Sequence, residues 1–154
     1  MIIECRGNLL DDDADVLVCT TNAIGVMGKG VALAFKNKWP SIFEPYKNDC
    51  IMGKLYAGSC LLYDLPDNFD LFNPKIDRKW AAFCTKGHWK NPSEYRWIKE
   101  GLVQLYDLLV IGEYKTVAIP PLGCGLGGLE FYKVYPMIKE WFENSHIEAR
   151  VYLP

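Results

Sequence analysis

Residues Val117 to Glu130, VAIPPLGCGLGGLE, join a short apolar run to a loop that contains four glycines. The run at 117–119 favours a buried strand, which Pro120 and Pro121 end because proline donates no ladder hydrogen bond. Apolar residues then recur at helical spacing between Phe131 and Phe142. The stretch therefore predicts a strand, a glycine loop and a helix in direct succession.

The glycines of this loop, Gly123, Gly125, Gly127 and Gly128, suit a ligand that approaches the main chain closely. Glycine adopts positive φ freely, so that successive backbone N–H groups converge on one concavity where an anion binds. Open α/β sheets place their ligands in loops between a strand end and a helix start. The alternative is a plain tight turn, although four glycines exceed what one turn requires.

A second glycine-rich segment, Asn22 to Ala32 (NAIGVMGKGVA), follows another apolar run. It resembles a P-loop only superficially, because Gly30 follows Lys29 where Ser or Thr would hold magnesium. Nucleoside triphosphate hydrolysis is therefore disfavoured. The helix expected after this segment, which Pro40 ends, presents N-terminal amides that can face a phosphate.

The other apolar runs alternate between strand and helix character. We expect strands at about 1–5, 16–19, 58–63, 69–73, 80–84 and 147–152, and helices at about 31–39, 41–50, 91–109 and 131–142. Asn91, Pro92 and Glu94 match a helix cap, the first helical position and the third. The carboxylates between Asp11 and Asp15 lack the spacing of a calcium loop, so they indicate a solvated turn. The alternation predicts an α/β fold with a mixed, mostly parallel sheet and helices on both faces.

Composition sets the broad class. The chain has 154 residues and is 50% hydrophobic, which suits one domain over 1–154. Its six cysteines are scattered without a CxxC pair, a pattern that fits free thiols in a reducing cytoplasm. Two histidines give no recognisable metal-ligand spacing, so we expect no metal. No apolar run approaches a bilayer span, and nothing marks a subunit interface, so a monomer that is not bound to a membrane is expected.

Charge is uneven along the chain. The net charge of −2 argues against a protein that coats nucleic acid. Between Lys75 and Lys99, however, there are seven basic residues and only two acidic ones, with three tryptophans interleaved. Such a mixture favours a local contact with single-stranded nucleic acid, because phosphates attract charge and bases stack on aromatic rings. A solvated face with core tryptophans is the alternative.

Taken together, these segments resemble the macrodomain family. The resemblance lies in Gly7-Asn8-Leu9, in GVMGKGVA after Asn22, and in PPLGCGLGGLE from Pro120. NAIGVMGKG, Thr85-Lys86-Gly87-His88-Trp89 and GCGLGGL are more narrowly similar to the antitoxin-type, DarG-like macrodomains, which remove ADP-ribose from DNA bases. This resemblance implies a three-layer α/β/α fold and no cofactor. It also implies that the ligand is ADP-ribose or an ADP-ribosylated substrate, with single-stranded DNA as a local partner.

The resemblance also implies roles for individual residues. Lys86 would be the catalytic residue that attacks the anomeric carbon of the distal ribose. His88 and Trp89 would contact nucleic acid. The ligand-binding positions would be Asn8 and Leu9 beside adenine, Asn22 at the distal ribose, and, around ribose and diphosphate, Gly28, Lys29, Gly30, Val31, Thr85, Pro120, Leu122, Gly123, Cys124, Gly125, Leu126, Gly127 and Gly128.

Two positions depart from the family pattern. Asn8 stands where many macrodomains carry Asp, so adenine recognition would rest on a neutral side chain or the main chain. Gly127 stands where relatives that act on protein glutamates carry an acid, which favours a DNA-linked substrate. Two alternatives stay open: an enzyme acting on ADP-ribose 1''-phosphate or on ADP-ribosylated protein, and a reader that binds ADP-ribose without turnover. Which base is modified, and whether a toxin partner exists, are not indicated.

Overall fold

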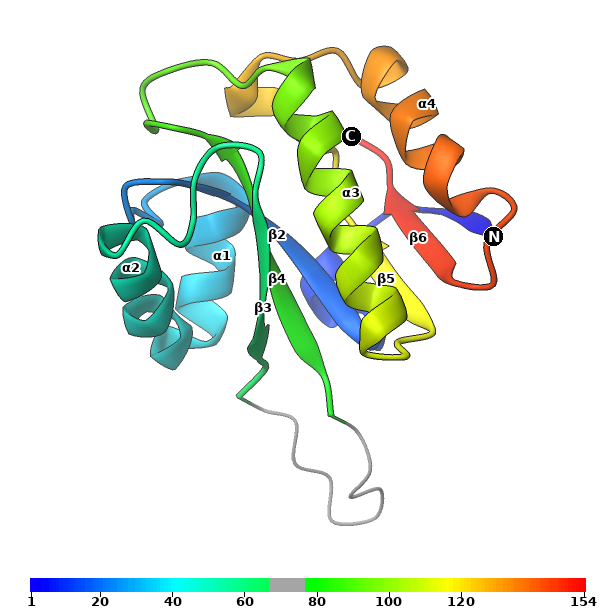
Figure 1. Ribbon diagram of the computed structural model, residues 1–154, viewed down its shortest axis with the longest axis horizontal. Coiled ribbons are helices and arrows are strands. Elements are labelled where there is room, and N and C mark those ends of the chain that lie inside the picture. Colours follow the sequence, from blue (N-terminus) through cyan, green and yellow to red (C-terminus); the bar gives the residue numbers. More distant parts are fainter. Residues whose placement is uncertain (67–76) are drawn as a thin grey trace.

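A computed structural model describes residues 1–66 and 77–154. Its centre is a six-stranded sheet in the order β1-β6-β5-β2-β4-β3 (Figure 1). All neighbouring strands are parallel except β3, which runs antiparallel to β4 at one edge. The strands are β1 Ile2–Cys5, β2 Val16–Asn22, β3 Cys60–Asp64, β4 Lys79–Lys86, β5 Thr116–Ile119 and β6 Glu148–Tyr152. The mixed, mostly parallel sheet predicted from the sequence is confirmed.

Helices cover both faces of the sheet (Figure 1). The helices are α1 Gly30–Lys38, α2 Phe43–Ile51, α3 Tyr95–Ile111 and α4 Phe131–Phe142, with short 3-10 turns η1 Leu9–Asp11, η2 Pro40–Ile42 and η3 Gly125–Gly127. Because side chains alternate along β2, Leu17 packs with α1 and α2 whereas Val18 packs with α3 and α4. The fold therefore has three layers, helices, sheet and helices, with one apolar core on each face of the sheet.

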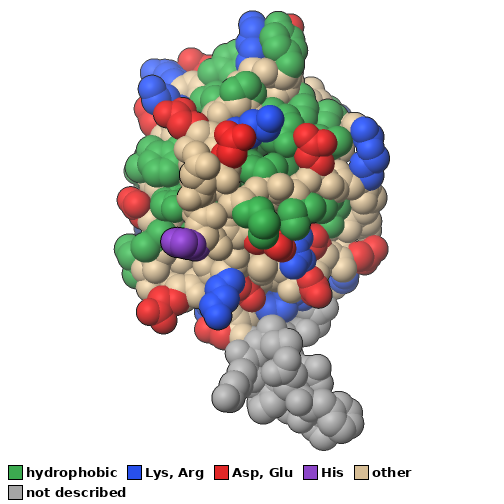
Figure 2. Space-filling view, turned by 90° about the vertical axis from the view of Figure 1, so that its right-hand side faces the viewer, with side chains coloured by type: hydrophobic (Ala, Val, Ile, Leu, Met, Phe, Trp, Pro, Cys, Tyr) green, Lys and Arg blue, Asp and Glu red, His purple; other side chains and the backbone are tan. Residues whose placement is uncertain are grey.

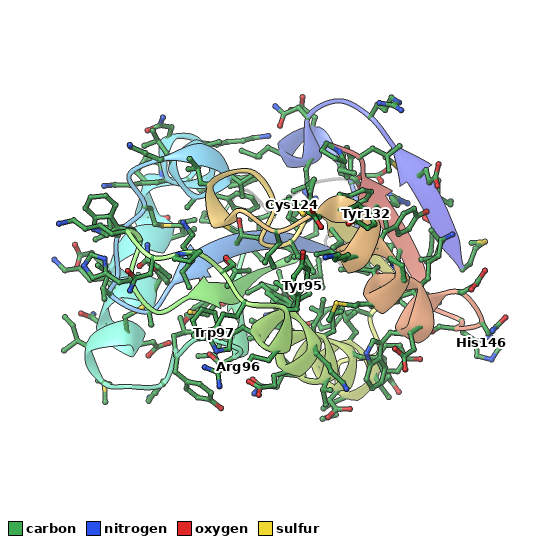
Figure 3. All side chains as sticks on the ribbon, turned by 90° about the horizontal axis from the view of Figure 1, so that it is seen from above. Tyr95, Arg96, Trp97, Cys124, Tyr132 and His146 are labelled. Atoms are coloured by element: carbon green, nitrogen blue, oxygen red, sulfur yellow. The ribbon has the colours of Figure 1, made fainter. Side chains whose placement is uncertain are left out.

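The parallel strands bring their carboxyl ends to one edge. β2 ends at Asn22, β4 at Lys86 and β5 at Ile119, and these three strands are neighbours in the sheet. Figure 3 looks down on this edge, with Cys124 near the middle of the view and His146 at its periphery. The segments that follow these strands therefore meet above the sheet, where α/β folds bind their ligands.

Helix α3 starts later than the sequence indicates. It begins at Tyr95, and Glu94 at its N-cap makes no side-chain capping bond. The predicted cap at Asn91 is wrong because the preceding segment is held elsewhere: Ser93 N donates to Gly127 O at 2.9 Å. A contact distant in sequence thus overrides the local capping signal. The strand expected at 69–73 lies outside the described residues.

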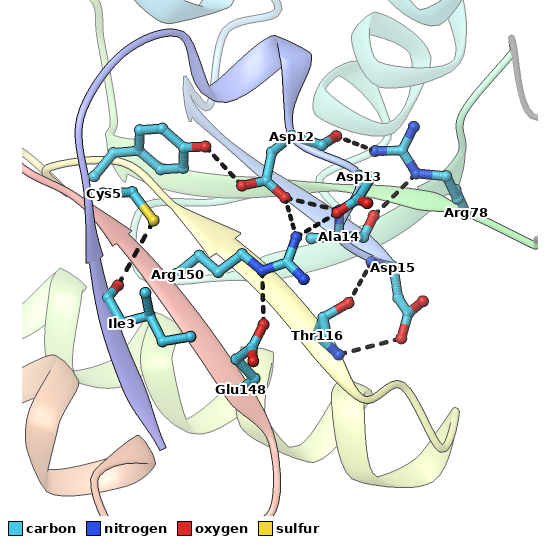
Figure 4. Close-up of polar contacts among 11 residues, drawn as sticks. Ile3, Cys5, Asp12, Asp13, Ala14, Asp15, Arg78, Thr116, Glu148 and Arg150 are labelled. Atoms are coloured by element: carbon cyan, nitrogen blue, oxygen red, sulfur yellow. Dashed lines mark hydrogen bonds and ion pairs between the residues drawn. The ribbon is translucent and has the colours of Figure 1, made fainter.

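The acidic segment before β2 is not a fully solvated turn (Figure 4). The Asp12 side chain is 5% exposed and accepts hydrogen bonds from Arg150 Nη1 and the Tyr152 hydroxyl, both at 2.6 Å. Although burial disfavours its charged form, bonds from Tyr152 and Arg150 hold the Asp12 pKa below its usual value. The prediction was wrong for this residue because its partners lie on β6, at the other end of the chain. Asp11 and Asp13, in contrast, are largely exposed.

On the face that carries β1, β6 and α4, acidic and basic side chains are interspersed (Figure 2). Such a mixed surface fits the net charge of −2 and offers no concentrated basic area for phosphates. Among the described residues, no helix combines the length and apolar character needed to cross a membrane.

Candidate active site

A pocket of about 520 Å³ opens at the carboxyl edge of the sheet. Five segments from different parts of the chain line it: the end of β2, the loop into α1, the end of β4 with Trp89, the loop after β5, and Pro154 after β6. The lining residues are Thr20, Thr21, Asn22, Val26, Gly28, Lys29, Gly30, Val31, Ala32, Thr85, Lys86, Trp89, Pro120, Pro121, Gly123, Cys124, Gly125, Leu126, Gly127 and Pro154. Both glycine loops therefore face one cavity, as the sequence predicts.

The loop after β5 is shaped by its own backbone. Gly123, Gly125 and Gly128 have φ angles of 70°, 67° and 80°, which other residues rarely adopt. Gly128 N donates to Gly125 O, and Leu129 N donates to Gly123 O, each at 3.0 Å. A Cβ at Gly123 would lie 2.7 Å from Leu129 Cδ1. Glycine is thus required at 123 for both conformation and space.

The loop before α1 is organised by Asn22. Its Oδ1 accepts from the amides of Ile24 and Val26, both at 3.2 Å, and its Nδ2 donates to Val26 O at 2.8 Å. Lys29 at the N-cap of α1 makes no side-chain capping bond, so the first helical amides stay open toward the pocket. The Asn22 side chain therefore shapes the loop. Its Nδ2 group has two hydrogens, and the bond to Val26 O uses only one of them.

Lys86, the last residue of β4, points across the pocket. Its Nζ donates to Leu126 O at 3.0 Å and to Trp89 O at 3.2 Å. Burial lowers the pKa of this amine below its usual value. A lowered pKa increases the neutral fraction, and only the neutral amine is nucleophilic. Lys86 is thus held by the second glycine loop, in a setting that favours its neutral form more than bulk water does.

Ser93 fills the space beside Gly127. A Cβ at position 127 would lie 2.5 Å from Ser93 Oγ and 3.9 Å from Lys86 Cε. Ser93 is 5% exposed, and within the described ranges its Oγ has no hydrogen-bond partner. With Ser93 in this position there is no room for a side chain at 127, which gives a physical reason for glycine there.

Five of the predicted site residues do not line the pocket. Asn8 caps η1 by accepting from Leu10 N, Leu9 and Leu122 are buried in the two cores, and Gly128 turns the loop behind the lining. His88 lies beside Trp89, with ring centroids 5.6 Å apart, and its Nδ1 accepts from Lys90 N.

Six lining residues were missed from the sequence: Thr20, Thr21, Val26, Ala32, Pro121 and Pro154. The threonines precede Asn22 on the same strand, so the strand-end argument could have included them. Pro154 has no local signal, because its position follows from the pairing of β6 with its neighbours β1 and β5.

Cys124 does not have the properties of a nucleophile. Burial raises the pKa of its thiol, and Sγ donates to Leu122 O at 3.6 Å. The interpretation of Cys124 as a loop-packing residue is consistent with this geometry. Across residues 1–66 and 77–154, no three His, Cys, Asp or Glu side chains form a group that could hold a metal ion.

Comparison with known proteins gives the class. A family model, Macro domain, matches residues 18–138, so the chain belongs to the macrodomain family. Over 97% of its length the chain is 38% identical to a Thermus aquaticus protein named DNA ADP-ribosyl glycohydrolase, of which it covers 40%. The chain thus spans about two fifths of the length of the curated relatives it matches.

Solved structures agree with this placement within the family. The macrodomain of Mycobacterium tuberculosis DarG has a TM-score of 0.90 and 34% identity, with coverage of 100% of this chain and 98% of that one. Thermosipho africanus DarTG in complex with ADP-ribose has a TM-score of 0.86 and 32% identity, with coverage of 96% and 40%. The chain is therefore similar to DarG macrodomains over its full length.

Proposed function

We propose that this macrodomain removes ADP-ribose from modified DNA bases, with Lys86 as the nucleophile. The observation that carries the proposal is the Lys86 amine, with its lowered pKa, inside the pocket that both glycine loops line. The name of the Thermus aquaticus relative, DNA ADP-ribosyl glycohydrolase, supports the choice of reaction.

The chemistry follows from a neutral amine. Lys86 Nζ forms a bond to the anomeric carbon of the distal ribose, while the bond from that carbon to the base breaks and the base leaves with a proton. One Nζ proton leaves with the base, and the second passes to the ring oxygen as the bond between that oxygen and the anomeric carbon breaks, which gives a Schiff base. Water then adds to the same carbon and the C–N bond breaks, which releases ADP-ribose and restores the amine.

The two loops suit the remainder of the ligand. The amides of Gly125 to Gly127 and the open N-terminus of α1 would bind the diphosphate, because both present N–H groups and positive partial charge to the pocket. The distal ribose would lie between Asn22 and Lys86. The Thermosipho africanus structure, described as a complex with ADP-ribose, supports this ligand.

Single-stranded DNA would leave the pocket over Trp89. This residue lines the pocket yet is 44% exposed, and Lys90 Nζ lies 5.3 Å from its ring centroid. An exposed indole with an adjacent cation suits an unstacked base beside a phosphate. His88 would add a second ring. Lys75, which belongs to the same basic stretch, lies outside the described residues.

A monomer in a reducing cytoplasm, without a cofactor, completes the proposal. All six cysteines lie in described segments and none forms a disulfide. Gel filtration coupled to light scattering tests the monomer, since a dimer would double the 17.6 kDa mass.

Comparison of wild type with Lys86→Ala and Lys86→Arg on three substrates tests the proposal: ADP-ribosylated single-stranded DNA, an ADP-ribosylated protein ester and ADP-ribose 1''-phosphate. We expect turnover of the DNA by wild type alone, because arginine keeps the charge but does not deprotonate. Borohydride should trap a covalent adduct that neither variant forms. Lys133→Ala, an exposed lysine on α4 outside the pocket, is the control. Binding of ADP-ribose without turnover of any substrate would instead show a reader, and preference for the ester or sugar phosphate would show the other enzyme class.

A further inference from the structure

Behind the pocket, one buried tyrosine connects α2 to the segments that carry the proposed site. Tyr46 has 0% exposure, and its hydroxyl donates to the main-chain oxygen of Asn22 at 2.7 Å, with Asn22 Oδ1 at 3.1 Å. Tyr46 is not among the residues that line the pocket. Any effect of this hydroxyl on a bound ligand must therefore pass through Asn22.

Asn22 transmits the contact along the loop before α1. Through Oδ1 and Nδ2 it bonds the amides of Ile24 and Val26 and the carbonyl of Val26. These bonds set the path of the chain toward Gly28 to Val31, which line the pocket. The loop is therefore held by one amide side chain, and Tyr46 holds the main chain of the residue that carries it.

The same junction reaches Lys86. A register shift between Thr21 and Asn22 pairs Asn22 with Lys86 across the sheet. The Lys86 carbonyl accepts from Ala23 N at 3.0 Å and from Cys84 Sγ at 3.3 Å. The main chain that carries the amine and the main chain that starts the loop are thus tied together directly beside Asn22.

The Tyr46 hydroxyl is the strong donor at this junction. Among the described residues, the other side-chain donor to the Asn22 carbonyl is Cys50 Sγ at 3.7 Å, and a thiol is a weak donor. Burial raises the pKa of Tyr46, so the hydroxyl keeps its proton throughout the neutral range. Loss of this hydroxyl would remove the stronger of these two side-chain donors from a buried carbonyl.

We propose that Tyr46 is a positioning residue. Its hydroxyl holds Asn22 so that the Gly28 to Val31 loop and the Lys86 amine keep a fixed separation before the substrate arrives, which reduces the ordering cost of binding. This inference rests on the proposed function. In this proposal, helix α2, which does not line the pocket, preorganises the site through Tyr46.

Tyr46→Phe, compared with Tyr63→Phe, tests the proposal. Tyr63 is a matched control because its hydroxyl donates to Asp49 Oδ2 at 2.7 Å and its ring stacks on Trp80, away from the pocket. We expect Tyr46→Phe to weaken ADP-ribose binding about tenfold, the equivalent of one lost hydrogen bond, and to lower kcat on ADP-ribosylated DNA. Tyr63→Phe should change neither.

Hydrogen exchange gives a readout that needs no ligand. In Tyr46→Phe the amides of Ile24 and Val26 should exchange at least about tenfold faster, whereas amides of α3, such as that of Leu102, should keep the rate seen in Tyr63→Phe. Equal acceleration of both sets would indicate global destabilisation and overturn the proposal. Unchanged exchange and affinity in Tyr46→Phe would overturn it as well. If wild type fails to bind ADP-ribose, the proposed function falls, and the exchange comparison still decides whether Tyr46 holds the loop.

Discussion

The two glycine loops both line the pocket, but different interactions hold them in place. The loop from Asn22 to Gly30 also contains glycines with positive φ, Gly25 at 79° and Gly30 at 60°, but the Asn22 amide holds it through side-chain bonds, and the Tyr46 hydroxyl holds the main chain of Asn22. The loop from Gly123 to Gly128 depends on its own backbone, through positive φ angles and internal hydrogen bonds. The loss of side-chain groups should therefore disturb the first loop in particular, whereas the gain of a Cβ is the main change that should disturb the second.

The largest effect is expected for Gly123→Ala. Alanine at φ 70° costs about 1–2 kcal/mol, and its Cβ would also collide with Leu129 Cδ1. We expect ADP-ribose affinity to fall by about 30-fold or more, measured by calorimetry. Gly53→Ala is the matched control, because Gly53 has φ 73° with nothing within 4 Å of the added Cβ. Equal losses in the two variants would contradict the steric account of the second loop.

Lys86, at the end of β4, donates to Leu126 O of this loop. The second-largest effect is expected from the titration of its amine. Burial lowers its pKa, and the neutral amine is the reactive form. Turnover of ADP-ribosylated DNA should therefore rise with pH by about tenfold per unit below that pKa and level off above it. Single-turnover rates across the alkaline range measure this profile. A pH-independent rate would argue against attack by this amine.

Asn22→Ala should disrupt the first loop. It removes the side-chain bonds to Ile24 and Val26 but keeps the main-chain oxygen that accepts from Tyr46, and we expect affinity for ADP-ribose to fall about tenfold as the loop loses its fixed course. Asn48→Ala, an exposed asparagine on α2, controls for the loss of an amide. Wild-type affinity in Asn22→Ala would show that the first loop, like the second, is held by its backbone.

The smallest effect is expected for Cys124→Ala. Cys124 contributes backbone to the second loop, and its thiol makes only a long bond to Leu122 O. Affinity and turnover should remain within about twofold of wild type. A loss comparable to that of Gly123→Ala would mean that side chains matter in this loop too.

Helices and strands whose signals lie within their own stretch of sequence were predicted well. The spacing of apolar residues places a helix at 131–142, as α4 is, and the runs at 16–19 and 80–84 lie in the buried strands β2 and β4. The glycine spacing also identified both pocket loops, because positive φ and close approach are local requirements.

Features that depend on distant partners were not predictable in this way. The cap expected at Asn91 was wrong because Ser93 bonds Gly127, and the buried state of Asp12 depends on Arg150 and Tyr152 of β6. The bonds of Asn22 to its own loop follow an Asx-type pattern, but Tyr46 reaches it only through the packing of α2. Spacing along the chain carries no information about such partners.

The contact between Ser93 and Gly127 couples two segments that are far apart in sequence. A Cβ at 127 would lie 2.5 Å from Ser93 Oγ, so any side chain at 127 requires the Ser93 side chain to shift or to be replaced. The side chains that positions 93 and 127 can carry are thus coupled by one small steric contact beside Lys86.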